Sequence, residues 1–273
     1  MPELPEVETV LRTLETKIKD RKIEAIKIIY KPIVSCEENT FKKKLIGQHF
    51  RQFKRRGKYL LFEMDDITLC SHLRMEGKYY YLEKDAPIDV HTHVVFYLDN
   101  NYKLAYHDVR KFGRMELIPK NEKYDDFKDL GPEPFDKHFN IHYVKDYLNG
   151  IKKPIKETLL NQNFVAGIGN IYADEILWSI SVHPLRPSNK LNDVEIKNLI
   201  SSTRRILKKA IKAGGTTIRS YTSSLGVTGR FQLELNCHTK ENCPKCHKEI
   251  VKIRVGGRGT YYCPNCQILW KLP

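Results

Sequence analysis

The sequence has little of what would tie it to a membrane or to the outside of a cell. In its 273 residues no apolar run approaches the ~18 residues that a membrane helix needs. The opening stretch MPELPEVETVLRTLETK is acidic with scattered apolar residues, unlike a signal peptide. The chain also lacks low-complexity tracts, and its 41% hydrophobic content excludes the disordered class. We therefore expect a cytoplasmic protein whose thiols stay reduced.

Acidic side chains are scarce toward the C-terminus. Residues 201–273 hold 14 Lys or Arg and 3 acidic residues, so most of the formal charge of +14 lies there. A polyanionic partner explains this imbalance, but general solubility explains an excess of lysine equally well. The charge alone leaves both interpretations open.

The hydrophobic pattern changes along a chain whose length predicts two domains. Residues 5–19 place apolar side chains at helical spacing, whereas residues 67–75 alternate as in a strand. A β-sandwich or barrel fits residues 20–120. The Pro- and Gly-containing segment 130–136 predicts a linker, and residues 193–213 are again helical.

Four of the seven cysteines follow the spacing C-x2-C-x16-C-x2-C, and they are Cys243, Cys246, Cys263 and Cys266. Two such pairs on adjacent hairpins place four thiolates tetrahedrally, which suits one structural Zn²⁺. A redox dithiol needs only one such pair, and haem attachment at residues 243–247 requires export. We therefore predict a zinc ribbon, with Cys237 and His238 nearby as spare ligands for a site that is already full.

The hairpin between the two cysteine pairs is basic and rich in glycine. It holds Lys252, Arg254 and Arg258 around a Gly-Gly turn. A hairpin with so few bulky side chains can approach a phosphate backbone closely. We favour this interpretation over a merely solvated arginine.

Residue 2 is a proline, and an initiator methionine is normally removed before such a small residue. A free α-amino group titrates near ~7.7–8.0, against ~10.4 for lysine, so a useful fraction is neutral at neutral pH. This secondary amine is a usable nucleophile, and its iminium with an aldehyde-like carbon stays cationic. Glu3 and Glu6 lie beside it and could move protons. The alternative, that PELPE only leads into a helix, is not excluded by these residues alone.

Six segments together match one set of family signatures in order along nearly the whole chain. They are MPELPEVETV at the start, GKYLLFEM (57–64), SHLRMEGKYY (71–80), DVRKFG (108–113), GIGNIYADEIL (167–177) and GRGTYYCPNCQ (257–267). In these segments the chain resembles the bacterial formamidopyrimidine-DNA glycosylases, which remove 8-oxoguanine from DNA.

The resemblance implies an α+β fold of two domains, in which an N-terminal helix and β-sandwich precede a helical helix-two-turn-helix domain ending in a β-hairpin zinc ribbon. The implied boundaries are a catalytic domain over 1–130, a linker over 131–150, a helix-two-turn-helix domain over 151–235 with a lesion-recognition loop at 216–229, and a zinc finger over 236–273. The implied partner is damaged double-stranded DNA, bound by a monomer without a protein partner.

The resemblance also implies roles for the catalytic residues. Pro2 attacks C1′ of the damaged nucleotide, and Glu3 donates a proton during base release and sugar opening. Glu6 supports the site, and Lys58 takes part in elimination. Arg258 serves the second elimination and binds phosphate.

Further residues of this chain match the family's DNA contacts. Met75, Arg110 and Phe112 would fill the space left by the extruded nucleotide, although core packing is the ordinary alternative for Met75 and Phe112. The remaining implied contacts, with phosphates or near the damaged base, are His91, Asn170, Lys156, Lys152 and Lys153.

Two departures from the family pattern are visible. Asn236-Cys237-His238-Thr239 stands where the family often has Val-Tyr-Gly-Arg. Ile151 stands where some members have a DNA-binding lysine, so the neighbouring lysines 152 and 153 are taken in its place.

Two rival functions are compatible with parts of the sequence. An endonuclease VIII-like enzyme would prefer oxidised pyrimidines, although the opening PELPEV and the Met75, Arg110 and Phe112 set favour the purine enzyme. A non-catalytic zinc-ribbon DNA-binding protein explains the charge and the cysteines but not Pro2-Glu3 together with Lys58.

Overall fold

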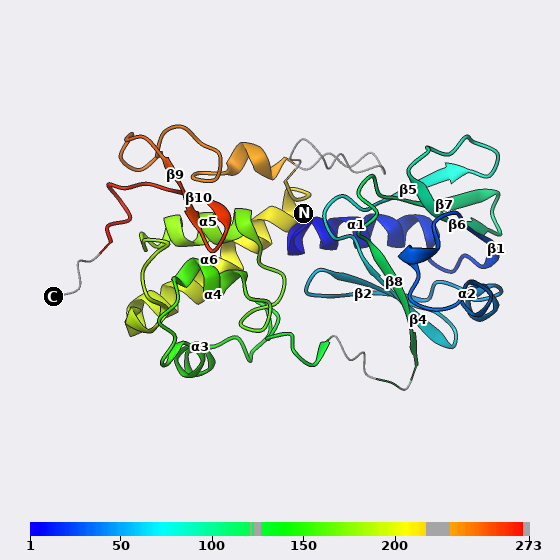
Figure 1. Ribbon diagram of the computed structural model, residues 1–273, viewed down its shortest axis with the longest axis horizontal. Coiled ribbons are helices and arrows are strands. Elements are labelled where there is room, and N and C mark those ends of the chain that lie inside the picture. Colours follow the sequence, from blue (N-terminus) through cyan, green and yellow to red (C-terminus); the bar gives the residue numbers. More distant parts are fainter. Residues whose placement is uncertain (121, 123–126, 217–229, 270–273) are drawn as a thin grey trace. The chain divides into compact units, whose positions relative to one another are not determined.

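The computed structural model describes residues 1–120, 122, 127–216 and 230–269 (Figure 1). The chain divides into two units, and each is treated by itself. The first unit comprises residues 1–128 and 213–230, and the second comprises residues 129–212 and 231–273. The expected lesion-recognition loop lies outside the described residues, except for Thr216.

Helix α1 (Leu4–Ile18) confirms the helix expected at the N-terminus. Its buried face repeats at helical spacing through Val7, Leu11, Leu14 and Ile18. Helix α1 packs on strands β2 (Gln52–Arg56) and β3 (Tyr59–Glu63). A capping box that joins Glu3 at the N-cap to Glu6 begins the helix. The sequence thereby fixes the first residues of the chain against the sandwich.

Two four-stranded antiparallel sheets form the sandwich of the first unit. One sheet has the order β1-β6-β7-β5 and the other β2-β3-β4-β8. The strands are β1 (Ile23–Ile28), β2 (Gln52–Arg56), β3 (Tyr59–Glu63), β4 (Ile67–His72), β5 (Lys78–Glu83), β6 (Thr92–Leu98), β7 (Tyr102–His107) and β8 (Arg114–Pro119). Helix α2 (Glu38–Leu45) and the 3-10 turn η1 (Lys31–Ile33) complete the unit.

One hydrophobic core joins the two sheets and α1. Alternate strand residues point into it because successive side chains of a strand face opposite ways. Its members include Leu14, Leu60, Phe62, Leu69, Val94, Phe96, Leu104, Tyr106 and Met115, all buried. Met75 lies beyond the end of β4, in the turn before β5, and is half-exposed rather than part of this core.

The second unit is helical and ends in a β-hairpin. It contains α3 (Ile141–Leu148), α4 (Ile155–Leu160), α5 (Asn170–Ser179), α6 (Asp193–Lys212), the 3-10 turns η3 (Ser188–Lys190) and η4 (Phe231–Glu234), and strands β9 (Val251–Val255) and β10 (Arg258–Tyr262). Within this unit α5 packs against α4, α6 and β10. No helix among the described residues is long and apolar enough to cross a membrane.

The stretch expected as a linker, residues 131–150, contains a packed helix. Val144 and Leu148 of α3 are buried, and α3 packs on α6. Asn140 caps the helix by accepting the Tyr143 N–H at 3.1 Å. The prolines before residue 136 suggested a connection, but the apolar spacing after Asn140 makes this stretch part of the second unit.

Candidate functional site

The start of the chain is enclosed by charged groups of the first unit. Pro2, Glu3 and Lys58 are all buried, and Lys58 lies in the turn between β2 and β3. Burial lowers the pKa of the Met1 α-amine. The charges of Glu3 and Glu6 raise this pKa, and the charge of Lys58 lowers it further. If Met1 is removed, as expected before a proline, the amine of Pro2 becomes the N-terminus next to these groups. A lower amine pKa leaves more of the neutral, nucleophilic form at neutral pH.

Glu6 has a structural task at this site. Its Oε2 accepts the Glu3 backbone N–H at 2.9 Å, and its Oε1 accepts the Thr216 N–H at 2.8 Å and the Thr216 hydroxyl at 3.0 Å. Gly215 has a positive φ of 77°, and a Cβ there would lie 2.9 Å from the same Oε1. Glu6 therefore fastens residue 216 to the beginning of α1.

His72 lies beside Lys58 and was missed by the sequence reasoning. It ends β4, its ring contacts the Tyr59 ring at a centroid distance of 4.5 Å, and its Nδ1 accepts the Arg74 N–H at 2.9 Å. Burial, together with the charges of Arg74 and Lys58, lowers the pKa of His72 to about 3. A neutral imidazole thus lies next to the Lys58 ammonium, and the motif SHLRMEG already contained the signal.

The loop after β7 presents Arg110 and Phe112 at the surface. Phe112 is 49% exposed, and the Arg110 guanidinium lies 4.8 Å from its ring centroid. The buried Asp108 carboxylate accepts the backbone N–H groups of Arg110, Phe112 and Gly113 at 3.1, 2.9 and 2.8 Å. Core packing is therefore excluded for Phe112, and Asp108 is the residue that shapes the loop.

His91 lies half-exposed on the same unit, before β6. Its backbone N–H donates to Asp89 Oδ1 at 2.7 Å, and its ring contacts the His107 ring at 5.7 Å. Asp89 Oδ1 also accepts His107 Nε2 at 2.9 Å. The histidine is held in place at the surface, as its expected phosphate contact requires.

In the second unit, other expected DNA contacts come from α5, from the start of β10 and from the segment before α4. Asn170 begins α5, and its Nδ2 donates to the Gly259 carbonyl at 2.9 Å. Arg258 is exposed at the start of β10. Lys152 and Lys153 are exposed before α4 and line a cavity of about 500 Å³ that Tyr147 and Asn161 also line.

Lys156 differs from the other expected DNA contacts because it is fully buried, with 0% of its side chain exposed. Its Nζ lies 2.5 Å from Asp174 Oδ1, so the two form a buried ion pair. A direct contact with a damaged base stays a prediction, and the structure shows a different setting for this lysine.

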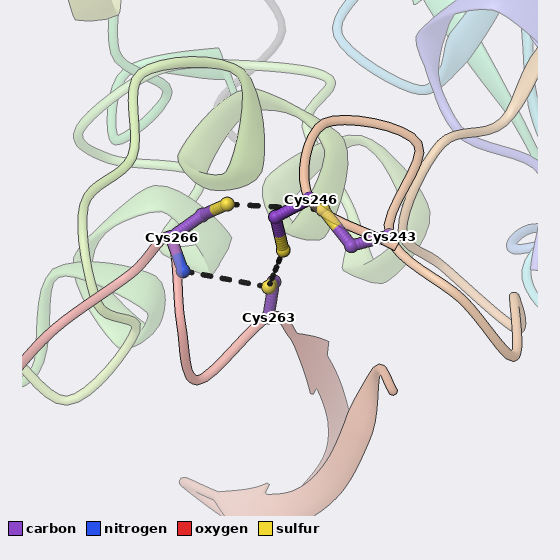
Figure 2. A group of neighbouring side chains, drawn as sticks. All are labelled: Cys243, Cys246, Cys263 and Cys266. Atoms are coloured by element: carbon purple, nitrogen blue, oxygen red, sulfur yellow. Dashed lines mark hydrogen bonds between the residues drawn. The ribbon is translucent and has the colours of Figure 1, made fainter. Parts of the chain in front are cut away.

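The four cysteines of the ribbon converge (Figure 2). All four Sγ atoms lie within 4.8 Å of one another, with 3.9 Å between Cys243 and Cys266 and 3.4 Å between Cys246 and Cys263. A tetrahedral zinc with Zn–S bonds of about 2.3 Å places its sulfurs about 3.8 Å apart. The four thiols therefore fit one zinc ion.

The surroundings of Cys243 favour a thiolate. Burial opposes ionisation, but hydrogen bonds from the Trp178 indole N–H and from the backbone N–H groups of Cys246 and Lys245 lower the pKa of the thiol to about 6. The Trp178 Nε1 lies 3.4 Å from Cys243 Sγ. Thiolate is the form that binds zinc, so the α5 helix prepares the site for the metal.

Comparison with known proteins places these features in one group. Family models match "Formamidopyrimidine-DNA glycosylase N-terminal domain" at residues 1–115, "Formamidopyrimidine-DNA glycosylase H2TH domain" at 130–222 and "Zinc finger found in FPG and IleRS" at 240–268. The chain is 45% identical to a formamidopyrimidine-DNA glycosylase of Ligilactobacillus salivarius, with 98% of this chain and 99% of the relative covered. It is 46% identical to one of Streptococcus pyogenes, with 98% of each covered.

Solved structures give the same result. A Lactococcus lactis FPG mutant in complex with Fapy-dG containing DNA matches with a TM-score of 0.94 and 45% identity, covering 98% of this chain and 100% of that one. The Lactococcus lactis Fpg in complex with DNA containing an abasic site matches with a TM-score of 0.93 and 46% identity, with the same coverage.

Proposed function

This chain belongs to the formamidopyrimidine-DNA glycosylase family, and from that membership we propose that it excises oxidised purines from duplex DNA and then cleaves the abasic strand. The relatives of known structure bind DNA with a Fapy-dG or an abasic site, which supports this substrate class. The proposed setting is the bacterial cytosol at the nucleoid, where such DNA lies.

Access to the damaged base requires extrusion of its nucleotide from the duplex. Arg110 and Phe112 project from the loop that Asp108 holds, and Met75 is half-exposed in its turn. An aromatic ring and a thioether suit the apolar stacking space, and the guanidinium can donate hydrogen bonds to the orphaned cytosine. These three residues are the proposed occupants of the gap.

Base release in this scheme starts at Pro2. Its nitrogen bonds to C1′ as the bond from C1′ to the base breaks, and the departing base takes up a proton. After the nitrogen loses its proton, the bond from C1′ to the ring oxygen opens, and the Glu3 carboxyl gives that oxygen a proton. The product is an iminium between Pro2 and C1′, bonded covalently to the DNA.

Strand cleavage follows from the positive charge of the iminium. The charge acidifies the C2′ proton, whose loss gives an enamine that expels the 3′ phosphate from C3′. Loss of the C4′ proton then expels the 5′ phosphate, and water frees Pro2 and leaves a one-nucleotide gap. Lys58 and Arg258 are the proposed cations that stabilise the leaving phosphates.

The observation that supports the proposal most directly is the enclosure of the chain's first residues. Pro2, Glu3 and Lys58 are buried together, and burial lowers the pKa of the preceding amine. A helix lead-in alone requires neither a buried lysine nor a depressed amine pKa. An amine with a lowered pKa, next to a carboxyl group and a cation, supports the proposed nucleophile.

The test is to trap the iminium with borohydride on a duplex that carries 8-oxoguanine opposite cytosine. We expect a covalent adduct with the native chain and none with a chain that keeps an uncleaved extension before Pro2. The same extension at the C-terminus is the control and should not prevent the adduct.

Three results would contradict the proposal. Normal cutting by the N-terminally extended chain would exclude Pro2 as the nucleophile. Faster excision of thymine glycol than of 8-oxoguanine would indicate the endonuclease VIII-like activity. Tight binding of lesion DNA without any adduct would indicate a non-catalytic DNA-binding protein.

A further inference from the structure

The segment before the ribbon, where this chain has Cys237-His238, wraps onto helix α5. The backbone N–H groups of Cys237 and His238 each donate to Glu175 Oε1 at 2.8 Å, and that of Asn236 donates to Oε2 at 3.0 Å. Glu175 itself is buried. Three consecutive N–H groups around one carboxylate attach the backbone firmly at residues 236–238.

His238 completes a buried charged network on the neighbouring residue of α5. Its Nδ1–H donates to Asp174 Oδ2 at 2.7 Å, and Lys156 Nζ donates to Asp174 Oδ1 at 2.5 Å. The backbone N–H of Tyr261 also donates to Asp174 Oδ2, at 3.1 Å. One carboxylate therefore joins two cationic or polar side chains to the backbone of β10.

The same network holds β10 at a second point. Lys156 Nζ lies 3.4 Å from the Gly259 carbonyl oxygen, and Asn170 Nδ2 donates to that oxygen at 2.9 Å. Gly259 follows Arg258 directly, and Tyr261 lies three residues after Arg258. The strand that begins with Arg258 is thus fixed to α5 at Gly259 and at Tyr261.

The two oxygens of Asp174 have separate tasks, and this gives His238 its importance. Oδ1 faces Lys156, whereas Oδ2 must stay aligned with the Tyr261 N–H. Without the imidazole, the attraction of the buried lysine can turn the carboxylate toward Nζ and release the strand. A buried ion pair relies on such additional hydrogen bonds to keep one geometry.

We propose that His238 is a positioning residue for Arg258. His238 acts through Asp174 and holds β10 in the position that presents Arg258 to a DNA phosphate. This inference rests on the proposed function, because it takes the role of Arg258 in the second elimination from there. It also assigns Lys156 to the same positioning network.

The experiment compares the products of single-turnover cleavage of a duplex that contains an abasic site. Arg258→Ala is the reference variant. It should accumulate the product of the first elimination, because the second elimination fails. His238→Ala should slow the second elimination by about tenfold to a hundredfold, as expected for a misplaced group. Iminium trapping with borohydride should change by less than about twofold, because Pro2 belongs to the other unit.

Two further variants separate positioning from general loss of structure. His238→Asn keeps a side-chain N–H near the place of Nδ1 and should restore most of the second elimination. His142→Ala removes an exposed histidine of α3 in the same unit and should behave as the native chain. Zinc content and Tm are measured for each variant, and Asp174→Asn tests the same link if His238→Ala loses zinc.

The outcomes are distinguishable. An unchanged product ratio in His238→Ala, with a shifted ratio in Arg258→Ala, would overturn the positioning role alone. An unchanged ratio in Arg258→Ala would overturn the assigned role of Arg258 and the inference together. An equal decline of both eliminations and of trapping in His238→Ala, not rescued by Asn, would show a merely structural histidine.

Discussion

Replacement of Asp108 by alanine tests what holds Arg110 and Phe112 at the surface. The carboxylate accepts three backbone N–H groups, from Arg110, Phe112 and Gly113. A hydrogen bond to a charged group contributes about 1.5–3 kcal/mol. Arg110 and Phe112 are exposed, so water can replace much of the hydrogen bonding that their backbone N–H groups lose. Gly113 is buried, so its N–H would stay unsatisfied. We therefore expect the free energy of unfolding to fall by about 2–4 kcal/mol.

The proposed function also predicts an effect of this loop on excision. Once it loses its anchor, Arg110 and Phe112 no longer stand ready to enter the duplex, and excision should slow by about tenfold to a hundredfold. The measurements are urea unfolding and single-turnover excision of 8-oxoguanine opposite cytosine. Asp108→Asn keeps one acceptor oxygen and should give intermediate values for both.

The matched control is Asp99→Ala, which removes an exposed aspartate from the turn between β6 and β7. It should leave unfolding and excision close to those of the native chain. If Asp108→Ala were as stable and as fast as this control, the carboxylate would not be what shapes the loop.

Three other predictions follow from named contacts. Burial and the charges of Arg74 and Lys58 lower the pKa of His72 from 6.5 to about 3, so its contribution to stability is present above pH 6.5 and lost as the pH falls below that value. Urea unfolding at pH 7 and pH 5 should show the native chain losing about 2 kcal/mol more than His72→Gln, and equal losses would contradict the burial argument. Cys263→Ser should lower zinc content and DNA affinity, measured by metal analysis and fluorescence anisotropy, with little change in the first unit; affinity that survives zinc loss would remove the ribbon from the DNA contacts. Lys152→Ala should reduce the slope of log Kd against log salt by about 0.9, and an unchanged slope would mean that this lysine contacts no phosphate.

Local patterns were sufficient for much of the fold. The spacing of Val7, Leu11 and Leu14 predicted α1, and the alternation after Ile67 predicted β4, because each pattern matches the geometry of one element. Residues 131–150 were harder, since prolines suggested a connection while the helix depends on packing against α6. Local propensity does not contain that tertiary contact.

The site divides in the same way. The motifs contained Pro2, Glu3, Lys58 and Phe112, and also Asp108, which holds the Phe112 loop, but the approach of His72 to Lys58 depends on strand pairing. His72 adjoins Lys58 only because β3 and β4 pair, with Tyr59 opposite His72. Long-range register of this kind cannot be read from a single segment.

By itself the sequence determined the chemistry that is available: a secondary amine behind a removable methionine, four thiols at zinc spacing and a surplus of cations. Only the tertiary structure decided which charges are withdrawn from water. It exposed Phe112, for which core packing was the alternative to a DNA contact, and it buried Lys156 against Asp174, with Nζ 3.4 Å from the Gly259 carbonyl oxygen of β10. The physical reason is that burial and pairing depend on elements brought together from distant positions, whereas the chemical identity of a side chain is fixed by its own residue.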